Sequence, residues 1–188
     1  RLVREIAGEE GWTLRFVRCE WRACLEQLGE ARIDLMPDVA LTEARDRRFD
    51  FHDVPVAHAW SVILTRADAS ATDLDSMDRR RIAVLAGAVQ REPLARMLEG
   101  LGLSYSLAPF ASYPEAFEAV RDGRADAVAA NSFYASFFAG RYELRETPYV
   151  FNPVALYFAA PEGDPAGLLP VVDEYLERWR YDQDSVYY

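Results

Sequence analysis

The sequence predicts an α/β protein built from two lobes. Segments with apolar residues at helical spacing alternate with short apolar runs typical of strands, and this alternation begins near Trp21 and again at Arg81. Two longer apolar segments, 54–65 and 154–160, link the halves of the pattern, so we expect two crossing segments and a cleft. The expected lobes are residues 1–66 with 154–188, and residues 67–153.

The first half of the chain begins with a helical pattern and continues with strands. The apolar residues of the opening share one helical face, which Gly11 interrupts. Apolar residues recur at i, i+3, i+4 and i+7 from Trp21 to Leu28, which predicts a helix that Gly29 ends. The expected elements are helices over 1–10 and 21–29, strands over 13–18, 33–36 and 54–65, and a polar linker over 66–78.

The second half alternates strands and helices more regularly. Ser112 and Glu115 form a capping-box pattern with Pro114 in the first turn, which predicts the start of a helix. Other helices are indicated by apolar residues three and four apart, and strands by short continuous apolar runs. The expected strands are 82–86, 105–108, 125–130 and 154–160, and the expected helices are 94–101, 113–120, 131–140 and 168–179.

Composition and charge exclude several function classes. The chain has 188 residues, of which 51% are hydrophobic, and a formal net charge of -10, so a nucleic acid is not an expected partner. All 21 basic residues are Arg, so no P-loop lysine, Schiff-base lysine or Ser-Lys dyad can form. No apolar run approaches about 18 residues, and the first ten residues lack a signal-peptide pattern. Any targeting or anchoring segment is expected outside this sequence.

Cysteine and histidine give no framework for a disulfide-rich or metal-dependent protein. Cys19 and Cys24 are expected as two buried thiols, with one local bridge in an oxidising compartment as the alternative. His52 and His58 could share a metal with Asp53, but no recognised ligand spacing supports such a site. No nucleophile elbow or dinucleotide fingerprint occurs, so no cofactor is expected.

The residues arranged most like a binding site are Asp38 to Arg45, directly after a predicted strand. Open α/β sheets place ligands at strand carboxyl ends, and an Arg there can hold a carboxylate by two parallel hydrogen bonds. Ala40 lies within this segment. The alternative is that Arg45 belongs to a solvated basic patch with Arg47 and Arg48.

Two further turns and two aromatic residues are candidate ligand contacts. Gly87, Ala88 and Gln90 lie at a strand-to-helix turn, where free backbone N–H groups attract an anion. The alternative for this turn is a plain turn glycine. Asn131 lies at the equivalent turn after the next strand and could instead cap a helix. Both aromatic residues could instead belong to the core. The aromatic candidates are Trp21 and Trp60.

Residues 33–56 resemble the family 3 extracellular solute-binding proteins. The family motif runs Asp, apolar residues, Gly, a Ser or Thr position, then Thr-x-Glu-Arg and an Asp-Phe-Ser-Asp-like turn. Trp21, the Gly87 turn and the Gly-Arg-Ala-Asp-Ala segment at 123–127 follow in family order. The segments at 37–40 and 184–188 look like the variant used as the extracytoplasmic sensor of membrane-bound histidine kinases and diguanylate cyclases.

The resemblance implies roles for the candidate residues. It makes Arg45 the clamp for a ligand carboxylate and Trp21 an aromatic wall, and it places the backbone of 87–90 on the ligand and Trp60 on a hinge-connected strand. Ala40 stands at the Ser or Thr position, so one carboxylate contact is lost. Three other departures are Asn131 in place of the Asp that neutralises an α-ammonium, Asp38 in place of Gly, and a first strand of the family that is missing before residue 1.

Together these observations predict a non-catalytic, extracytoplasmic sensor domain of a membrane signalling protein, with a histidine kinase as the expected output. It would bind a small anionic or zwitterionic ligand that carries a carboxylate, and it could form a homodimer. Membrane contact is expected only through segments outside this chain, on the periplasmic side of the bacterial inner membrane. Two alternatives are a free periplasmic amino-acid or organic-acid binding protein of an ABC importer, and a dehydratase-like enzyme using Asp38 and Glu43.

Overall fold

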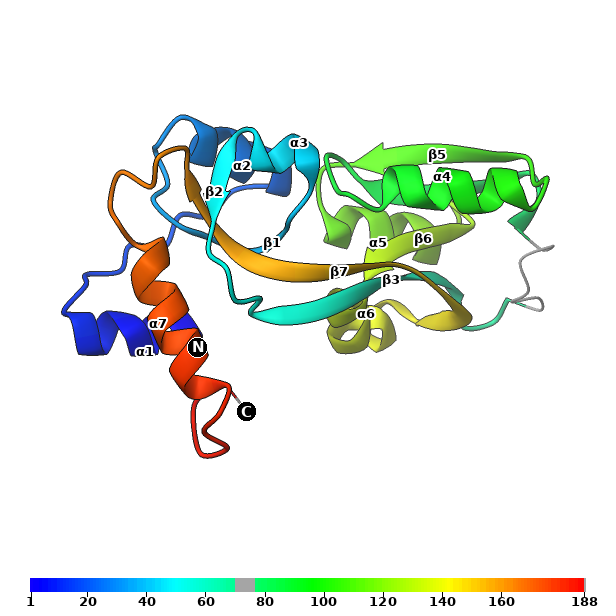
Figure 1. Cartoon of the computed structure of the whole chain (residues 1–188). Helices are drawn as coiled ribbons and strands as arrows, with labels where there is room; N and C mark the ends of the chain where they lie inside the picture. The colour runs from blue at the N-terminus through cyan, green and yellow to red at the C-terminus, as the bar shows by residue number, and fades with distance from the viewer. Residues whose placement is uncertain (70–76, 188) are drawn as a thin grey trace. The chain divides into compact units, whose positions relative to one another are not determined.

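The computed structural model describes residues 1–69 and 77–187 (Figure 1). The chain forms two compact units. Unit 1 contains residues 1–19, 23–58 and 155–188, and unit 2 contains residues 20–22 and 59–154. The expected lobes divided at residues 66 and 67, whereas the units divide at His58 and Ala59. Part of the expected polar linker, residues 70–76, lies outside the described residues.

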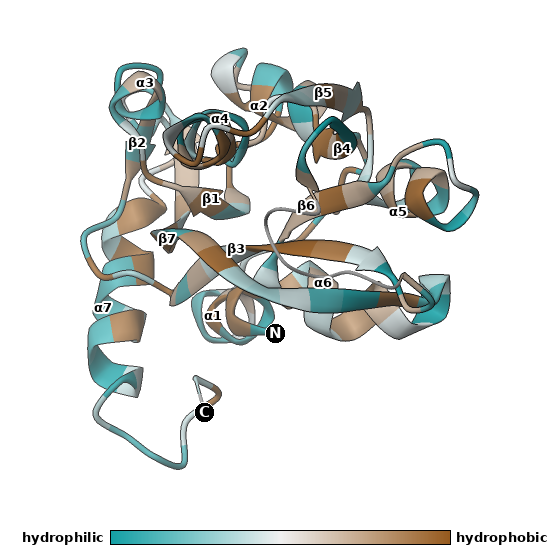
Figure 2. Ribbon diagram, turned by 90° about the vertical axis from the view of Figure 1, so that its right-hand side faces the viewer, coloured by the Kyte–Doolittle hydropathy of each residue, from teal (hydrophilic) through white to brown (hydrophobic). Residues whose placement is uncertain are grey.

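Unit 1 packs two helices against a small antiparallel ladder. Its strands β1 (Met36–Ala40) and β2 (Phe49–Phe51) both pair antiparallel with the final part of β7 (Leu144–Pro161). Figure 1 shows α1 (Leu2–Glu10) beside α7 (Leu169–Trp179), and Ile6 of α1 packs in one cluster with Val172 and Leu176. Alternating brown and teal bands along α7 in Figure 2 are typical of an amphipathic helix. The remaining helices of this part are α2 (Trp21–Gly29), whose first two residues count with unit 2, and α3 (Glu43–Asp46).

Unit 2 has a mainly parallel sheet with a hydrophobic cluster on each face. β4 (Arg80–Leu85) pairs parallel with β5 (Tyr105–Phe110) and with β6 (Ala127–Asn131), and β3 (Ala57–Arg66) pairs antiparallel with β6. Successive strand residues alternate between the clusters, because strand side chains point to opposite faces. One cluster includes residues of α5 (Tyr113–Arg121) and the other residues of α4 (Arg91–Gly100). Further helical segments are α6 (Ser132–Phe138) and the 3-10 turn η2 (Ala139–Tyr142).

Hydrogen bonds connect the strands of the described residues into one seven-stranded sheet. The order is β1-β7-β3-β6-β4-β5, and β2 also pairs with β7. The α/β class is therefore confirmed. β7 begins at Leu144, ten residues before the expected strand, because its first half mixes polar and apolar residues and lacks a continuous apolar run.

Two strand predictions for the first half were wrong. Residues 13–18 form neither helix nor strand, and Phe16 is 65% exposed. Alternation indicates an extended chain, but a strand also needs a hydrogen-bonded partner, which a local pattern cannot reveal. The strand expected at Ile33 starts instead at Met36, after a bend.

The helix predictions agree with the structure. Ser112 caps α5, and its Oγ accepts a hydrogen bond from the backbone N–H of Glu115 at 3.4 Å, as the capping box predicts. The opening helix is confirmed as α1, which ends at Gly11 with φ 70. Gly11 suits this left-handed position because it has no Cβ.

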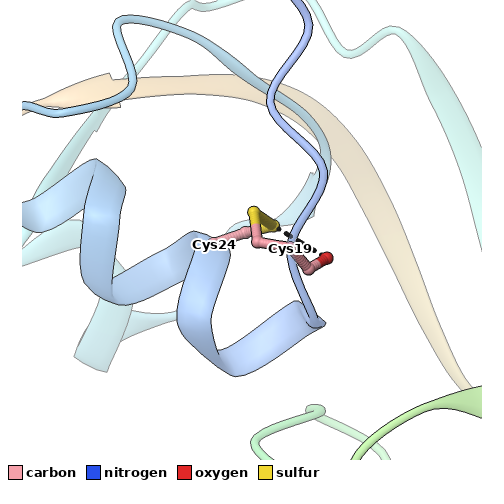
Figure 3. The surroundings of a disulfide bond; sticks show 2 residues. All are labelled: Cys19 and Cys24. Carbon is pink, nitrogen blue, oxygen red and sulfur yellow. Dashed lines mark hydrogen bonds between the residues drawn. A yellow bond between two sulfur atoms is a disulfide. The ribbon is translucent and has the colours of Figure 1, made fainter.

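The two cysteines form a disulfide (Figure 3), so the expectation of two buried thiols was wrong. Cys24 lies in the first turns of α2, and Cys19 lies in the irregular segment just before it. Their Cα atoms are 5.4 Å apart, within the range that a disulfide can bridge. The sulfur of Cys24 also lies 3.2 Å from the carbonyl oxygen of Cys19, a close contact without a donated proton.

Candidate functional site

Unit 1 holds Arg45 in a buried position beside the end of β1. Thr42 caps α3 and orients its first turn, because its Oγ1 accepts a hydrogen bond from the backbone N–H of Arg45 at 3.3 Å. The Arg45 side chain is folded inward: the residue is only 8% exposed, and its Nη1 donates to the carbonyl oxygen of Ala40 at 3.0 Å. Arg47 and Arg48 are exposed, so Arg45 is not part of a solvated patch.

Burial changes the electrostatics of the Arg45 guanidinium. Desolvation lowers the pKa of Arg45 to about 10, which still leaves the side chain charged at neutral pH. A buried charge loses hydration, and a carboxylate that approaches a guanidinium offsets this loss. The arrangement can therefore hold an anion.

Asp38 lies at an irregularity in β1. The register with β7 shifts between Met36 and Val39, and Asp38 has φ 59. This left-handed conformation favours Gly, and Asp is among the residues that tolerate it. The backbone thus accounts for a Gly at this position in the motif that the segment resembles. Desolvation raises the pKa of the Asp38 carboxyl.

In unit 2, Tyr113 connects two of the candidate residues, Gln90 and Asn131. The Tyr113 Oη accepts hydrogen bonds from Gln90 Nε2 at 3.0 Å and from the backbone N–H of Asn131 at 3.1 Å. Asn131 also caps α6, since its Oδ1 accepts from the backbone N–H of Tyr134 at 2.7 Å. The capping alternative for Asn131 is therefore confirmed, and its side-chain NH₂ group is separate from the cap.

Trp21 and Ala88 pack against the hydrophobic cluster that contains Tyr113. Gly87 starts the turn before Gln90 with φ 75, a left-handed conformation that favours Gly because it has no Cβ. Trp60 on β3 is 48% exposed, so it is not a core residue, and its backbone N–H donates to Ser132 Oγ at 3.4 Å.

Tyr113 is a residue of the candidate site that the sequence did not reveal. It is 9% exposed and connects the turn after β4 with the end of β6, although 23 and 18 residues separate it from its two partners. Burial raises the pKa of its hydroxyl, so it stays protonated. Its place beside the capping residue Ser112, at the start of a helix that follows a strand, was the available signal.

Each unit thus supplies its own set of candidate contacts. Unit 1 supplies Asp38, Ala40 and Arg45, and unit 2 supplies Trp21, Trp60, Gly87, Ala88, Gln90 and Asn131.

The family model of the bacterial extracellular solute-binding proteins, family 3, matches residues 1–182. This chain belongs to that family. None of the curated proteins matches the sequence.

Solved structures share the fold of this solute-binding domain. An ancestral arginine-binding protein bound to arginine aligns with TM-score 0.82 and 22% identity, covering 96% of this chain and 80% of that chain. An ancestral amino-acid-binding protein, a precursor of cyclohexadienyl dehydratase, aligns with TM-score 0.81 and 27% identity, covering 96% and 78%. A histidine kinase sensor domain with similarity to periplasmic binding proteins aligns with TM-score 0.80 and 23% identity, covering 96% and 77%. The chain therefore has the periplasmic-binding-protein fold.

The solute-binding domain places its two histidines in different surroundings. His52 is 3% exposed, and its Nε2 accepts a hydrogen bond from the backbone N–H of Phe158 at 2.8 Å. The ring proton therefore lies on Nδ1, which faces Asp173 Oδ1 at 3.4 Å. His58 is exposed. Among the residues that the structure describes, no group of three His, Cys, Asp or Glu side chains could hold a metal ion.

His52 makes the stability of the solute-binding domain depend on pH. Desolvation lowers the pKa of His52 below its ordinary 6.5, against the opposing effect of Asp173 and, more weakly, Asp53. The folded state then binds a proton less tightly than the unfolded chain does. The free energy of unfolding should be fully retained above about pH 6.5 and should decrease as the pH falls below it.

Urea unfolding between pH 5 and 7.5 measures this dependence. His52→Gln, whose side-chain oxygen can still accept from Phe158, should flatten the slope that wild type shows. His58→Gln is the matched control, since these are the two histidines of the chain, and it should keep the wild-type slope. An unchanged slope in His52→Gln would contradict the prediction.

None of the helices in the described part of the chain has the length and apolar character needed to cross a bilayer.

Proposed function

We propose that this solute-binding domain is the extracytoplasmic sensor of a membrane signalling protein and binds a small metabolite through the metabolite's carboxylate. The observation that carries the proposal is the buried guanidinium of Arg45, which donates to the Ala40 carbonyl oxygen, while Thr42 caps the Arg45 backbone N–H. An Arg in this position presents a planar donor group that is charged at neutral pH and suits a carboxylate better than Lys would.

Two further observations support a sensor role. The histidine kinase sensor domain shares the fold over 96% of this chain. In addition, Pro37–Ala40 and Asp184–Tyr188 resemble sensor variants of the family in sequence. A ligand signals only through its differential affinity for two conformations of the domain, so binding and signalling need separate tests.

The binding part of the proposal is tested by Arg45→Ala. Carboxylates that raise the melting temperature of wild type in a thermal-shift screen should lose about 100-fold in affinity, because a truncated charge pair loses several kcal/mol. Isothermal titration calorimetry of the wild-type hit and the variant measures the loss.

Two further variants control for folding and charge. Arg47→Ala removes an exposed Arg in the next turn and should keep the affinity of wild type. Arg45→Lys keeps the charge but not the forked donor geometry, and should also weaken binding. Unchanged affinity in folded Arg45→Ala, checked by circular dichroism, would rule out Arg45 as the carboxylate partner.

The signalling part is tested by the reading frame beyond Tyr188. A transmembrane segment followed by a kinase or cyclase domain supports the sensor assignment. A stop codon directly after this segment would favour a free receptor that delivers its ligand to an importer.

A further inference from the structure

The disulfide encloses a short segment of the chain that packs with unit 2. It joins Cys19 to Cys24 across residues 20–23 (Figure 3). Residues 20–22 of this loop count with unit 2, whereas residues 1–19 and 23–58, which include both cysteines, count with unit 1. The bridge therefore closes the loop near the two points at which the chain leaves unit 1 and returns to it.

The enclosed loop contributes two side chains to unit 2. Trp21 packs against the hydrophobic cluster that contains Tyr113, and Ala88 of the turn after β4 packs against the same cluster. Arg22 lies against this turn, since a Cβ placed on Gly87 would be 3.8 Å from the Arg22 Cβ. The disulfide thus restrains a loop that helps to cover one face of unit 2.

The disulfide is open to a reductant in the folded protein. Cys19 and Cys24 are half-buried, and the residues on either side of Cys19, Arg18 and Glu20, are exposed. Thiol–disulfide exchange requires a thiolate to reach one of the two sulfur atoms, so exposed bridges are the labile ones. No unfolding of the core is needed to expose this bridge.

The local fold also favours release of Cys24 over release of Cys19. Cys24 lies in the first turn of α2, where the positive end of the helix dipole stabilises a thiolate, and a thiol of lower pKa leaves faster. The Cys19 carbonyl oxygen, 3.2 Å from the Cys24 sulfur, can accept the S–H proton of reduced Cys24. Both the leaving thiolate and the final thiol are therefore stabilised.

We propose that the Cys19–Cys24 disulfide is a redox-responsive site, which a dithiol reduces in the folded protein and whose reduction loosens the packing of Trp21 within unit 2. A thiolate of the dithiol attacks the Cys19 sulfur, the S–S bond breaks, and Cys24 leaves as a thiolate that takes up a proton. The second thiol of the dithiol attacks the mixed disulfide and releases Cys19. Two electrons and two protons pass from the dithiol, which becomes a cyclic disulfide, to the two cysteines.

The inference goes beyond the proposed function, because it concerns the chemistry of the loop and needs no bound ligand. It bears on the candidate contacts of unit 2, since Trp21 is one of them and Gly87 and Ala88 lie in the turn that the loop contacts. The redox state would act on these residues together.

The first experiment measures how fast dithiothreitol reduces the bridge. Thiols are trapped with iodoacetamide and counted by mass spectrometry, in native protein and in protein unfolded by concentrated urea. The two rates should agree within about 100-fold, because a bridge that opens only through global unfolding reacts about 1000-fold more slowly or worse. A larger difference than about 100-fold would overturn the proposal.

The second experiment measures hydrogen exchange of wild type before and after reduction. Backbone amides of residues 86–90 and of the first turn of α5 should exchange at least about tenfold faster in the reduced protein. The amides of α4 should keep their rates, because the buried side chains of α4 belong to the cluster on the opposite face of the sheet. Unchanged exchange at 86–90, or an equal increase in α4, would contradict the local release of the loop.

Variants show whether reduction acts through Trp21. The double variant Cys19→Ser, Cys24→Ser should show the fast exchange at 86–90 with or without dithiothreitol. Trp21→Ala should show it in the oxidised state, and reduction should add nothing further. Trp12→Ala is the matched control: Trp12 packs against the cluster of unit 1, so this variant should keep the wild-type response to dithiothreitol. Equal responses of the Trp21→Ala and Trp12→Ala proteins would overturn the role of Trp21.

The outcomes separate the inference from the proposed function. If the native bridge resists dithiothreitol while Arg45→Ala abolishes binding of a carboxylate, the proposed function stands and the inference is overturned. If reduction releases the loop in a protein that binds no carboxylate, the inference stands and the proposed function fails.

Discussion

Asp173→Ala is expected to lower the free energy of unfolding by about 3 kcal/mol, because two backbone N–H groups lose a charged acceptor. The Asp173 carboxylate accepts from the backbone N–H of Asp53, with both oxygens at 2.9 Å, and from that of Val54 at 2.8 Å. It also faces the ring of His52, whose side chain is fully buried. One side chain of α7 thus satisfies two backbone donors of the segment before β3.

Urea denaturation at pH 7.5 measures this loss, and Glu174→Ala provides the matched control. Glu174 is the next residue on α7 and is exposed, so its removal should change stability by less than about 0.5 kcal/mol. Asp173→Asn keeps one oxygen acceptor and should fall between the two variants. Equal stability of the Asp173→Ala and Glu174→Ala proteins would show that the hydrogen bonds from the Asp53 and Val54 backbone N–H groups to Asp173 do not stabilise the fold.

Replacing both cysteines by Ser is expected to lower the free energy of unfolding by about 2 kcal/mol, since the bridge closes a short loop of the unfolded chain. The bridge joins Cys19, in an irregular segment, to Cys24 in α2. Without it, residues 12–20 are tied to that helix only through the main chain that leads into it. Urea unfolding of the oxidised wild type and the double variant gives the difference.

A reductant distinguishes loss of the bridge from the effect of the Ser side chains. It should bring wild type close to the stability of the double variant and leave the double variant unchanged. The chain has just two cysteines, so thiol titration of the denatured, unreduced protein is direct. Two reactive thiols per chain would contradict the disulfide.

The sequence predicted the helices and most of the strands of unit 2 because their signals are local. The capping residue Ser112 and the helical apolar face that follows it lie within a few residues of each other. Residues 13–18 carried an equally local alternating pattern, yet they form no strand. The difference is that helix hydrogen bonds lie within the segment, whereas strand hydrogen bonds need a distant partner.

For the candidate site too, the sequence revealed the residues whose signal is local and missed the one whose role depends on distant contacts. Arg45 could be found because its position after a strand and its side-chain chemistry both appear in a short segment. Its burial and its bond to Ala40 required coordinates. Tyr113 was missed because its role comes from contacts with residues 18 and 23 positions away.

The sequence by itself determined the α/β class, the resemblance to solute-binding proteins, the absence of lysine chemistry and the residue types offered to a ligand. Tertiary structure alone decided that Cys19 pairs with Cys24 and that His52 lies against Phe158 and Asp173. It also decided that Tyr113 joins Gln90 to Asn131. Local propensity depends on neighbours along the chain, whereas burial and hydrogen bonding between distant residues depend on how the whole unit packs.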